Sequence, residues 1–304
     1  MKTQSFAPAE QSGSDSLPIE WIILNGHDDR DRAWIDKQSG FDEAVKAIVS
    51  MPPTHVRRVH LGTEIVLTLA RRDGTTRNDP TGLTMVIDTH RLVTVCYGTD
   101  AIVEEALERQ TTGSVPAGIS RILSLLVAAL IKPLDSEITV LSDRIDALED
   151  QAMKASEDGM DDAVVLIGRR ALSLRRYLAP MHDEVSYLAL NPDELPGSVE
   201  AKSLRRAAES LARLVSALDS SHNRVLLILD QLKNRDVSRQ ARSMHKLTLV
   251  ATVFLPLTFI TGLLGINVAG IPDAHNPLGF WVVCGILLGV AVLATLLIRW
   301  RKWM

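Results

Sequence analysis

Two long apolar blocks near the C-terminal end dominate the hydropathy pattern of the chain. They cover Leu247–Ile266 and Leu278–Ile298, and neither contains a charged residue. A helix needs about 20 predominantly apolar residues to cross the hydrocarbon core of a bilayer. Only the polar segment 267–277 joins the two blocks. The pattern therefore predicts a hairpin of two transmembrane helices; the alternative is a buried hairpin in a soluble core.

Basic residues flank both outer ends of this hairpin. Four of them precede the first block, namely Arg235, Arg239, Arg242 and Lys246. The segment 299–304 contains two more arginines and a lysine, whereas 267–277 contains no Lys or Arg and one acid, Asp273. The positive-inside rule then predicts that both chain ends are cytoplasmic, with 267–277 as a periplasmic loop and 299–304 as a cytoplasmic basic tail.

Strand-like and helical patterns interleave in the first third of the chain. Alternating, β-branched runs predict strands at Glu20–Gly26, Glu64–Ala70, Leu83–Ile87 and Leu92–Tyr97. Helical patterns lie at Phe41–Met51 and Asp100–Gln110. We therefore predict a cytoplasmic α/β domain over residues 18–112. Residues 1–17 are polar and small, without the apolar core of a secretory signal, and we expect a disordered lead there.

Helical periodicity continues from Pro116 to the hairpin. Over the cytoplasmic helical region 113–198 it predicts three helices, at Ile119–Ile131, Pro133–Met153 and Asp161–Ala189. A last helix begins near Val199 and meets no breaker before Pro256. We therefore expect a stalk helix over 199–246 that continues into the first transmembrane helix. Such continuity would carry a movement at the cytoplasmic end to the membrane.

Composition removes several classes of function. The chain has 304 residues, with 33 basic and 37 acidic side chains, so we expect no nucleic-acid partner. Cys96 and Cys284 are far apart, which argues against a disulfide framework and a cysteine zinc site. Four histidines of the first domain, His27, His55, His60 and His90, lack the spacing of a metal motif. The α/β domain contains no residues with catalytic spacing either. We therefore predict no enzyme activity and no cofactor.

One stripe of the first apolar block differs from the rest. It consists of Ala251, Thr258, Gly262 and Gly265, at multiples of helical spacing. The second block is Leu, Val and Ile on nearly every side, which suits lipid. Because two helices cannot enclose a water-filled path, conduction would need several copies around one axis. We place the first block at the pore and the second outside it; the alternative is that small residues only allow close helix packing.

The tripeptide Gly265-Ile266-Asn267 follows at the outer end of this block, and Gly270-Ile271-Pro272 comes soon after it. Here the chain resembles the CorA metal-ion transporter superfamily, and within it the ZntB zinc-transporter branch. The superfamily signature is Gly-Met-Asn after the first of two C-terminal spans, and the branch tolerates Ile in the middle. The resemblance implies a homopentameric funnel in the bacterial inner membrane that transports a divalent cation, with zinc favoured.

The signature residues have a physical role in this interpretation. A ring of Asn267 amide oxygens can bind the water shell of a hydrated cation at the pore mouth, without direct ligation of the metal. Gly265 lets the helix end there. By resemblance, Thr258, Ala251 and Gly262 line the pore, and Met244 and Leu247 form an apolar gate that blocks ions by dewetting. The alternatives are an ordinary helix-terminal Asn and ordinary helix packing.

Polar residues lie on the same face of the stalk. Rings of Asp230 and Asn223 around an axis would attract cations, although a solvated stalk acid explains Asp230 equally well. Magnesium-transporting relatives carry an acid two positions after the signature Asn, where this chain has Ala269. Asp273 in the following loop retains an acid, and His275 beside it either contacts zinc or is incidental. These differences favour the zinc branch.

The first block contains no carboxylate or histidine. Proton coupling, which has been proposed for this branch, would then need groups at the mouths, namely His275, His245, Asp230 or His222. We read the chain as a zinc transporter with three kinds of partner: other copies of itself, membrane lipid and the transported Zn²⁺ or other divalent cations. The alternatives are a CorA-type magnesium or cobalt channel and a membrane-anchored stalk protein that signals without conducting.

Overall fold

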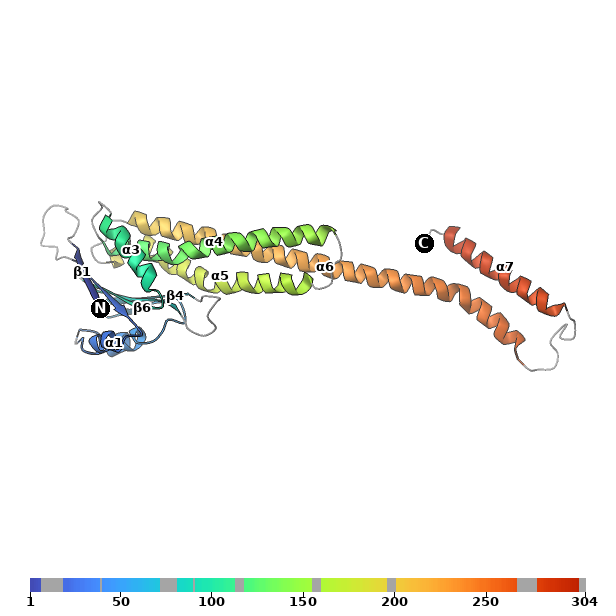
Figure 1. The fold of residues 1–304 in the computed structure, drawn as a ribbon, viewed down its shortest axis with the longest axis horizontal. Helices are drawn as coiled ribbons and strands as arrows, with labels where there is room; N and C mark the ends of the chain where they lie inside the picture. The colour runs from blue at the N-terminus through green and yellow to red at the C-terminus, as the bar shows by residue number, and fades with distance from the viewer. Residues whose placement is uncertain are drawn as a thin grey trace. The chain divides into compact units, whose positions relative to one another are not determined.

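The computed structural model describes residues 1–6, 19–38, 40–71, 81–89, 91–112, 118–154, 160–195, 201–266 and 278–300. The chain divides into two compact units, Met1–Leu229 and Asp230–Met304. Figure 1 shows the elements of both units, coloured by residue number.

The first unit contains a six-stranded sheet. Its strands are β1 (Lys2–Phe6), β2 (Ile19–Asn25), β3 (Arg57–Leu61), β4 (Glu64–Arg71), β5 (Thr81–Ile87) and β6 (Arg91–Tyr97). They lie in the order β1-β2-β6-β5-β4-β3, with β2 and β6 parallel and every other pair antiparallel. The predicted strands are confirmed by β2, β4, β5 and β6, because their β-branched and apolar side chains suit a sheet that is buried on both faces.

Helices cover both faces of this sheet (Figure 1). On one face, α1 (Asp29–Asp36) and α2 (Glu43–Val49) bury Ile35, Val45 and Val49 against alternate residues of the central strands. Each begins at an aspartate cap, since Asp28 accepts from the Arg30 backbone N–H at 2.9 Å and Asp42 from that of Ala44 at 3.1 Å. On the other face pack α3 (Asp100–Thr112), α4 (Ile119–Lys154) and α5 (Met160–Leu190).

The prediction of a disordered lead over residues 1–17 is wrong for its first part. Lys2–Phe6 forms β1 and pairs antiparallel with Ile19–Ile23 at the edge of the sheet. Backbone hydrogen bonds to β2 hold this strand, and Lys2 pairs with Glu104 of α3 at 2.5 Å. Because an edge strand needs no apolar alternation of its own, its polar sequence gave no signal. Residues 7–18 lie outside the described part of the chain.

The prediction of two helices on either side of Lys132 is also wrong. Helix α4 runs without a break from Ile119 to Lys154 and includes Pro133. Proline costs a helix one backbone hydrogen bond and creates a steric clash. Leu130 and Leu134, which flank Pro133, are both buried, and we attribute the continuity of the helix to this packing. The short 3-10 helix η1 (Pro192–Glu194) follows α5, and α6 (Ala201–Leu264) begins after it.

Arginine–carboxylate pairs join the helices α4, α5 and the first part of α6. Arg170 of α5 donates to Glu137 of α4 at 2.6 Å, and Arg175 pairs with Asp219 of α6. Arg224 of α6 donates to both carboxylate oxygens of Glu149, at 2.9 and 2.6 Å. Hydrogen bonding to Arg224 lowers the pKa of Glu149. These side chains are partly exposed, so their ion pairs add little to the stability of the bundle. Their main effect is to fix the register of the three helices.

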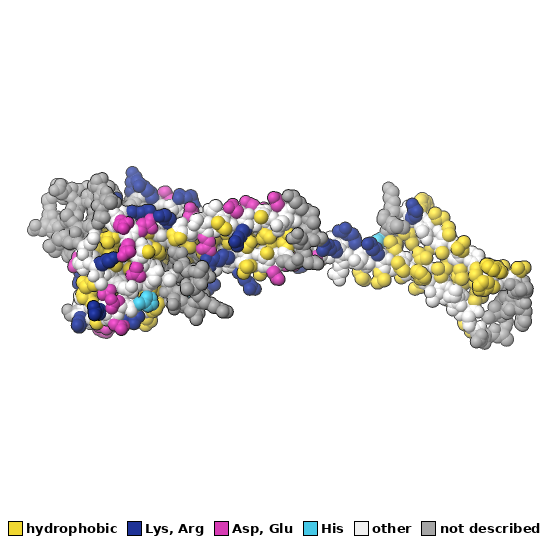
Figure 2. All heavy atoms as spheres, viewed as in Figure 1, with side chains coloured by type: hydrophobic (Ala, Val, Ile, Leu, Met, Phe, Trp, Pro, Cys, Tyr) yellow, Lys and Arg dark blue, Asp and Glu magenta, His cyan; other side chains and the backbone are white. Residues whose placement is uncertain are grey.

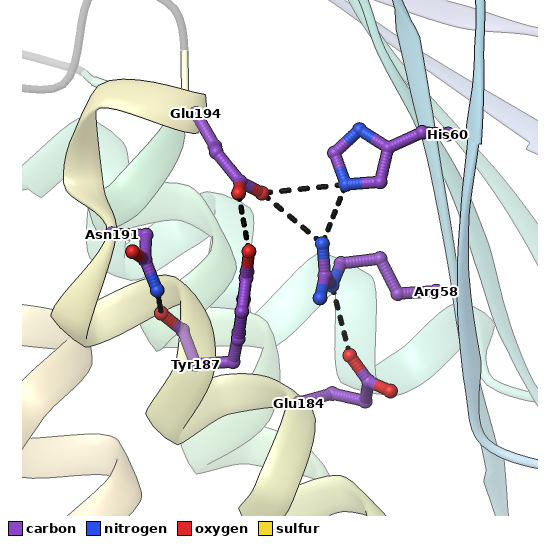
Figure 3. Close-up of polar contacts among 6 residues, drawn as sticks. All are labelled: Arg58, His60, Glu184, Tyr187, Asn191 and Glu194. Atoms are coloured by element: carbon purple, nitrogen blue, oxygen red, sulfur yellow. Dashed lines mark hydrogen bonds and ion pairs between the residues drawn. The ribbon is translucent and has the colours of Figure 1, made fainter.

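A second polar cluster joins the sheet to α5 and η1 (Figure 3). Arg58 of β3 donates to Glu184 at 2.9 Å and to Glu194 at 3.1 Å, and its guanidinium lies 3.7 Å from the ring centroid of Tyr187. The Tyr187 hydroxyl donates to Glu194 at 2.6 Å, and this bond raises the pKa of Tyr187. Arg58 thus connects residues more than one hundred positions apart in the chain.

We predict that Arg58→Met loosens the edge of the sheet. Loss of the guanidinium leaves two carboxylates without their charged donor, at a cost of about 1–3 kcal/mol in the free energy of unfolding. Hydrogen exchange should therefore become faster at the β3 amides. Arg57→Met, on the exposed neighbouring position of the same strand, is the control and should leave exchange unchanged. Equal exchange in the two variants would contradict the connecting role of Arg58.

Candidate ion pathway

The second unit contains the apolar segments. They are the C-terminal part of α6, which ends at Leu264, and α7 (Gly279–Trp300). Both helices are long and apolar enough to cross a membrane, with peak mean hydropathies of 2.1 and 2.7. None of the most apolar window of α6 and only 6% of that of α7 is buried within the chain. This exposure is what a lipid environment would accommodate and a water-soluble core would not.

One face of each apolar helix is half-buried. On α6 this face consists of Leu249, Val253, Pro256, Leu257 and Ile260. On α7 it consists of Val283, Cys284, Leu287, Val290, Ala291, Ala294 and the buried Ile298. Both sets follow helical spacing, as expected for two helices that shelter each other along one side.

The positions predicted to line a pore lie on the other side of α6. Leu247, Ala251 and Thr258 each precede a half-buried residue by two positions, and two residues turn an α-helix by about 200°. All three are exposed, as are Met244 and Gly262. Leu247 is 65% exposed and Met244 60%, so most of the surface of the predicted gate residues is uncovered in the single chain. The face is therefore free to meet other copies or water.

The hydroxyl groups of this segment are not equivalent. Those of Thr248, Thr252 and Thr261 donate to backbone carbonyls of the preceding turn, at 2.8–3.0 Å. Among the described residues, the Thr258 hydroxyl makes no such bond. Thr258 thus has both an exposed position and a hydroxyl group available for the water shell of an ion.

Helix α6 ends two residues before Ile266, the predicted end of the first transmembrane helix. Leu264 is its last residue, and the Gly265 backbone N–H donates to the Thr261 carbonyl at 2.9 Å. A Cβ at Gly265 would lie 3.1 Å from that same oxygen, whereas a Cβ at Gly262 would meet nothing within 4 Å. Gly265 therefore permits a close approach at the helix end, and Ile266 follows it at an exposed position. Asn267, Asp273 and His275, and also Ala269, lie outside the described residues.

The polar residues predicted on the stalk differ in how exposed they are. Asn223 and Asp230 are both exposed on α6, and Asp230 accepts from the Asn234 amide at 3.1 Å. His222 is half-buried, and its Nδ1 atom is buried without a hydrogen-bond partner in the structure. Asn223 and Asp230 are therefore open to solvent in the single chain, whereas His222 faces the bundle.

The described part of the chain contains no group of three or more His, Cys, Asp or Glu side chains arranged to hold a metal ion. His55 contacts the Thr54 hydroxyl at 2.9 Å, and His60 lies 3.3 Å from Glu194 in the cluster around Arg58. His90 is outside the described residues. Cys96 is buried, and burial raises its pKa to about 12.

Sequence reasoning missed the Arg58 cluster, because no local pattern links β3 to α5.

Comparison with known proteins identifies the class. The sequence pattern of the family described as "CorA-like Mg2+ transporter protein" matches residues 18–300. The chain therefore belongs to this family, whose members are transporters of divalent cations and not enzymes. The resemblance seen at Gly265-Ile266-Asn267 is confirmed at the level of the whole chain.

Individual relatives are named for different transported ions. The divalent cation transporter CmaX of Pseudomonas aeruginosa is 30% identical over 95% of this chain and 90% of its own length. The zinc transport protein ZntB of Yersinia enterocolitica is 27% identical over 93% of this chain and 88% of its own length. Both likenesses extend over nearly the whole of each protein, so they include the apolar hairpin as well as the N-terminal domain.

Solved structures show the same fold. The full-length CmaX structure has a TM-score of 0.73 at 27% identity and covers 94% of this chain and 89% of its own. The CorA magnesium transporter of Methanocaldococcus jannaschii has a TM-score of 0.78 at 15% identity and covers 100% of this chain and 99% of its own. At that identity the second likeness concerns the fold alone.

The two faces of α6 can be distinguished chemically. We predict that Thr258→Cys, in a protein whose Cys284 is replaced by Ala, reacts several-fold faster with a charged, water-soluble thiosulfonate than Ile260→Cys does, in vesicles. A wetted conduit admits the reagent to position 258, while α7 and lipid shield position 260. Cys96 should not interfere, because its buried thiol stays protonated. Equal rates, or faster reaction at position 260, would contradict this orientation of α6.

Proposed function

We propose that this protein transports zinc across the bacterial inner membrane through a homopentamer in which α6 of every copy faces a common axis. The observation that carries the proposal is the exposure of Leu247, Ala251 and Thr258 on the side of α6 away from its half-buried face. Family membership and the ZntB relatives support the cargo and the membrane. In this arrangement 247–266 and 278–298 cross the bilayer, 267–277 is periplasmic, and 18–246 and 299–304 are cytoplasmic.

The proposed path uses residues of one helix and the turn after it. A hydrated cation is collected at a ring of Asn267 amides, where oxygen atoms bind its water shell without removing it. It then passes Gly262, Thr258 and Ala251, which are small or carry a hydroxyl. The Leu247 and Met244 side chains of all copies surround the axis. They close the path by excluding water when this constriction narrows. Lower on α6, Asp230 and Asn223 supply polar rings, of which the carboxylates attract cations.

A magnesium or cobalt channel is the second candidate, and the description of the family by its Mg²⁺ cargo favours it. CmaX is named only for divalent cations and supports either candidate. The position two residues after Asn267 separates them, since Ala269 removes the acid that the magnesium-transporting relatives typically carry. Competition between Zn²⁺, Mg²⁺ and Co²⁺ for uptake into vesicles distinguishes the candidates: zinc transport requires that excess Mg²⁺ leave zinc uptake largely intact.

We predict that Asn267→Ala lowers zinc uptake into vesicles about tenfold or more, because loss of the amide ring removes about 1.4 kcal/mol or more of stabilisation for the entering ion. The control is Asn191→Ala, which removes the same group from the N-terminal unit, where its amide donates to the Tyr187 carbonyl at 2.9 Å. Uptake by the control should match the unmodified protein. Unchanged uptake in Asn267→Ala would instead support a membrane-anchored protein that does not conduct.

Proton coupling is part of the proposal, by groups at the mouths of the path. The apolar stretches 247–264 and 279–298 contain no Asp, Glu, His, Lys or Arg, so nothing inside them can relay a proton. His245, His222 and Asp230 lie below the membrane on α6, and His275 lies in the loop. We predict faster zinc uptake when the compartment that supplies zinc is more acidic. Zinc flux that does not respond to an imposed pH gradient would remove coupling and leave a passive pore.

A further inference from the structure

Four basic residues of α6 form a line that points away from the proposed pore. This basic stripe consists of Arg235, Arg239, Arg242 and Lys246, at spacings of four, three and four. Such spacing places them on one side of a helix. The last three are exposed and Arg235 is half-buried. Figure 2 shows the dark-blue side chains gathered on α6 just before the apolar surface begins.

The basic stripe continues directly into the half-buried face of the apolar segment. From Lys246 the same alternation of three and four positions leads to Leu249, Val253, Pro256 and Ile260. The residues proposed to line the pore lie about 200° around the helix, two positions away. A basic ring inside the path would repel cations, whereas basic residues on this side face outward, beneath α7 and the surrounding lipid.

No carboxylate compensates these four cations within the described residues. Arg170, Arg175 and Arg224 in the bundle each pair with Asp or Glu. By contrast, the side chains of the basic stripe make one bond to other described residues, from Arg242 Nε to the Ser238 carbonyl at 3.3 Å. The nearest acid of this segment, Asp236, lies off the stripe. The stripe is thus a line of positive charge without an internal partner.

The distance of these residues from the apolar block places them where the surface of a bilayer would lie. Lys246 directly precedes the first apolar block, and the helical rise places Arg242 about 7.5 Å below Leu247 and Arg239 about 12 Å below it. The headgroup layer extends about 5–7 Å beyond the hydrocarbon on each side. Lys246 and Arg242 therefore lie at headgroup depth. Arg299 and Trp300, both exposed at the end of α7, are the residue types that favour this interface.

We propose that the basic stripe is a binding surface for anionic phospholipid headgroups of the cytoplasmic leaflet. Lys246 and Arg242 would donate to lipid phosphates, with Arg239 and Arg235 adding attraction across the aqueous layer within a Debye length of about 8–10 Å. Arginine forks suit phosphate oxygens, and the positive charge suits a negatively charged leaflet. The inference rests on the membrane crossing of the proposed function, but not on conduction.

The test measures lipid preference on the intact protein. The full-length protein is purified in detergent and mixed with equal amounts of phosphatidylglycerol and phosphatidylcholine, and the lipid retained is counted by native mass spectrometry. We expect the unmodified protein to prefer the anionic lipid. The double variant Arg242→Gln/Lys246→Gln should lower that preference about tenfold or more, since each basic residue near the surface contributes about fivefold. Added salt should weaken the preference of the unmodified protein.

The control removes equal charge elsewhere on the same helix. Lys233→Gln/Arg205→Gln changes two exposed positions, of which Lys233 lies close to the stripe in sequence but on the other side of the helix. Its lipid preference should stay within about twofold of the unmodified protein, because the surface near the headgroups is intact. An equal loss in both double variants would show an effect of net charge alone and would overturn the proposal.

Two further outcomes are informative. If an acidic segment of a neighbouring copy covers the basic stripe, Arg242→Gln/Lys246→Gln would disrupt the oligomer without changing lipid preference, and the proposal would be overturned. If lipid preference falls as expected while the unmodified protein shows no zinc uptake, the proposed transport fails and the lipid surface stands. Because lipid retention and ion flux are measured separately, the two failures cannot be confused.

Discussion

The hydrogen-bonded backbone of one helix is the constraint on which the rest of this protein depends. Helix α6 covers Ala201–Leu264, from the N-terminal bundle into the apolar segment. Inside lipid, every backbone N–H and C=O must find a partner within the protein, which a helix provides along its own length. Pro256 interrupts this pattern once, since it offers no N–H to the Thr252 carbonyl. The proline lies on the half-buried face, away from the proposed path.

The same helix has a different environment in each part, and each environment selects its residues. In the bundle, Leu204, Leu211, Leu218 and Val225 repeat at seven positions and are buried, while Arg224 on another side pairs with α4. Gly168 of α5 allows close contact there, because a Cβ would lie 2.8 Å from Val225. In the apolar segment the roles of the sides change: one is sheltered by a neighbouring helix, and the opposite one has small or hydroxyl-bearing side chains. Helix α6 thus has a buried face in the bundle and an exposed face in the apolar segment.

Sequence reasoning succeeded where a periodic pattern decides the structure. The apolar blocks follow from their length and lack of charge, and the inner strands and the long bundle helices from the burial of regularly spaced side chains. It failed where tertiary contacts decide. Strand β1 is held by backbone bonds to β2, and α1, which was not predicted, has only two buried residues. Helix α4 passes through Pro133 because of the packing of its neighbours. For the ion pathway, Thr258 and Gly262 indicate one side of α6, and this stays a prediction. The cluster around Arg58 joins residues that no local pattern connects.

The middle of α6 has a consequence for how the protein is made. Between the bundle, whose last buried position is Ile228, and the apolar segment lie residues 230–246, almost all of them exposed. An isolated helix of this length is only marginally stable in water, and this one has no apolar face to bury. Its two ends, in the bundle and in the apolar segment, hold it in the single chain. A newly synthesised chain would therefore be most vulnerable to proteases at this point.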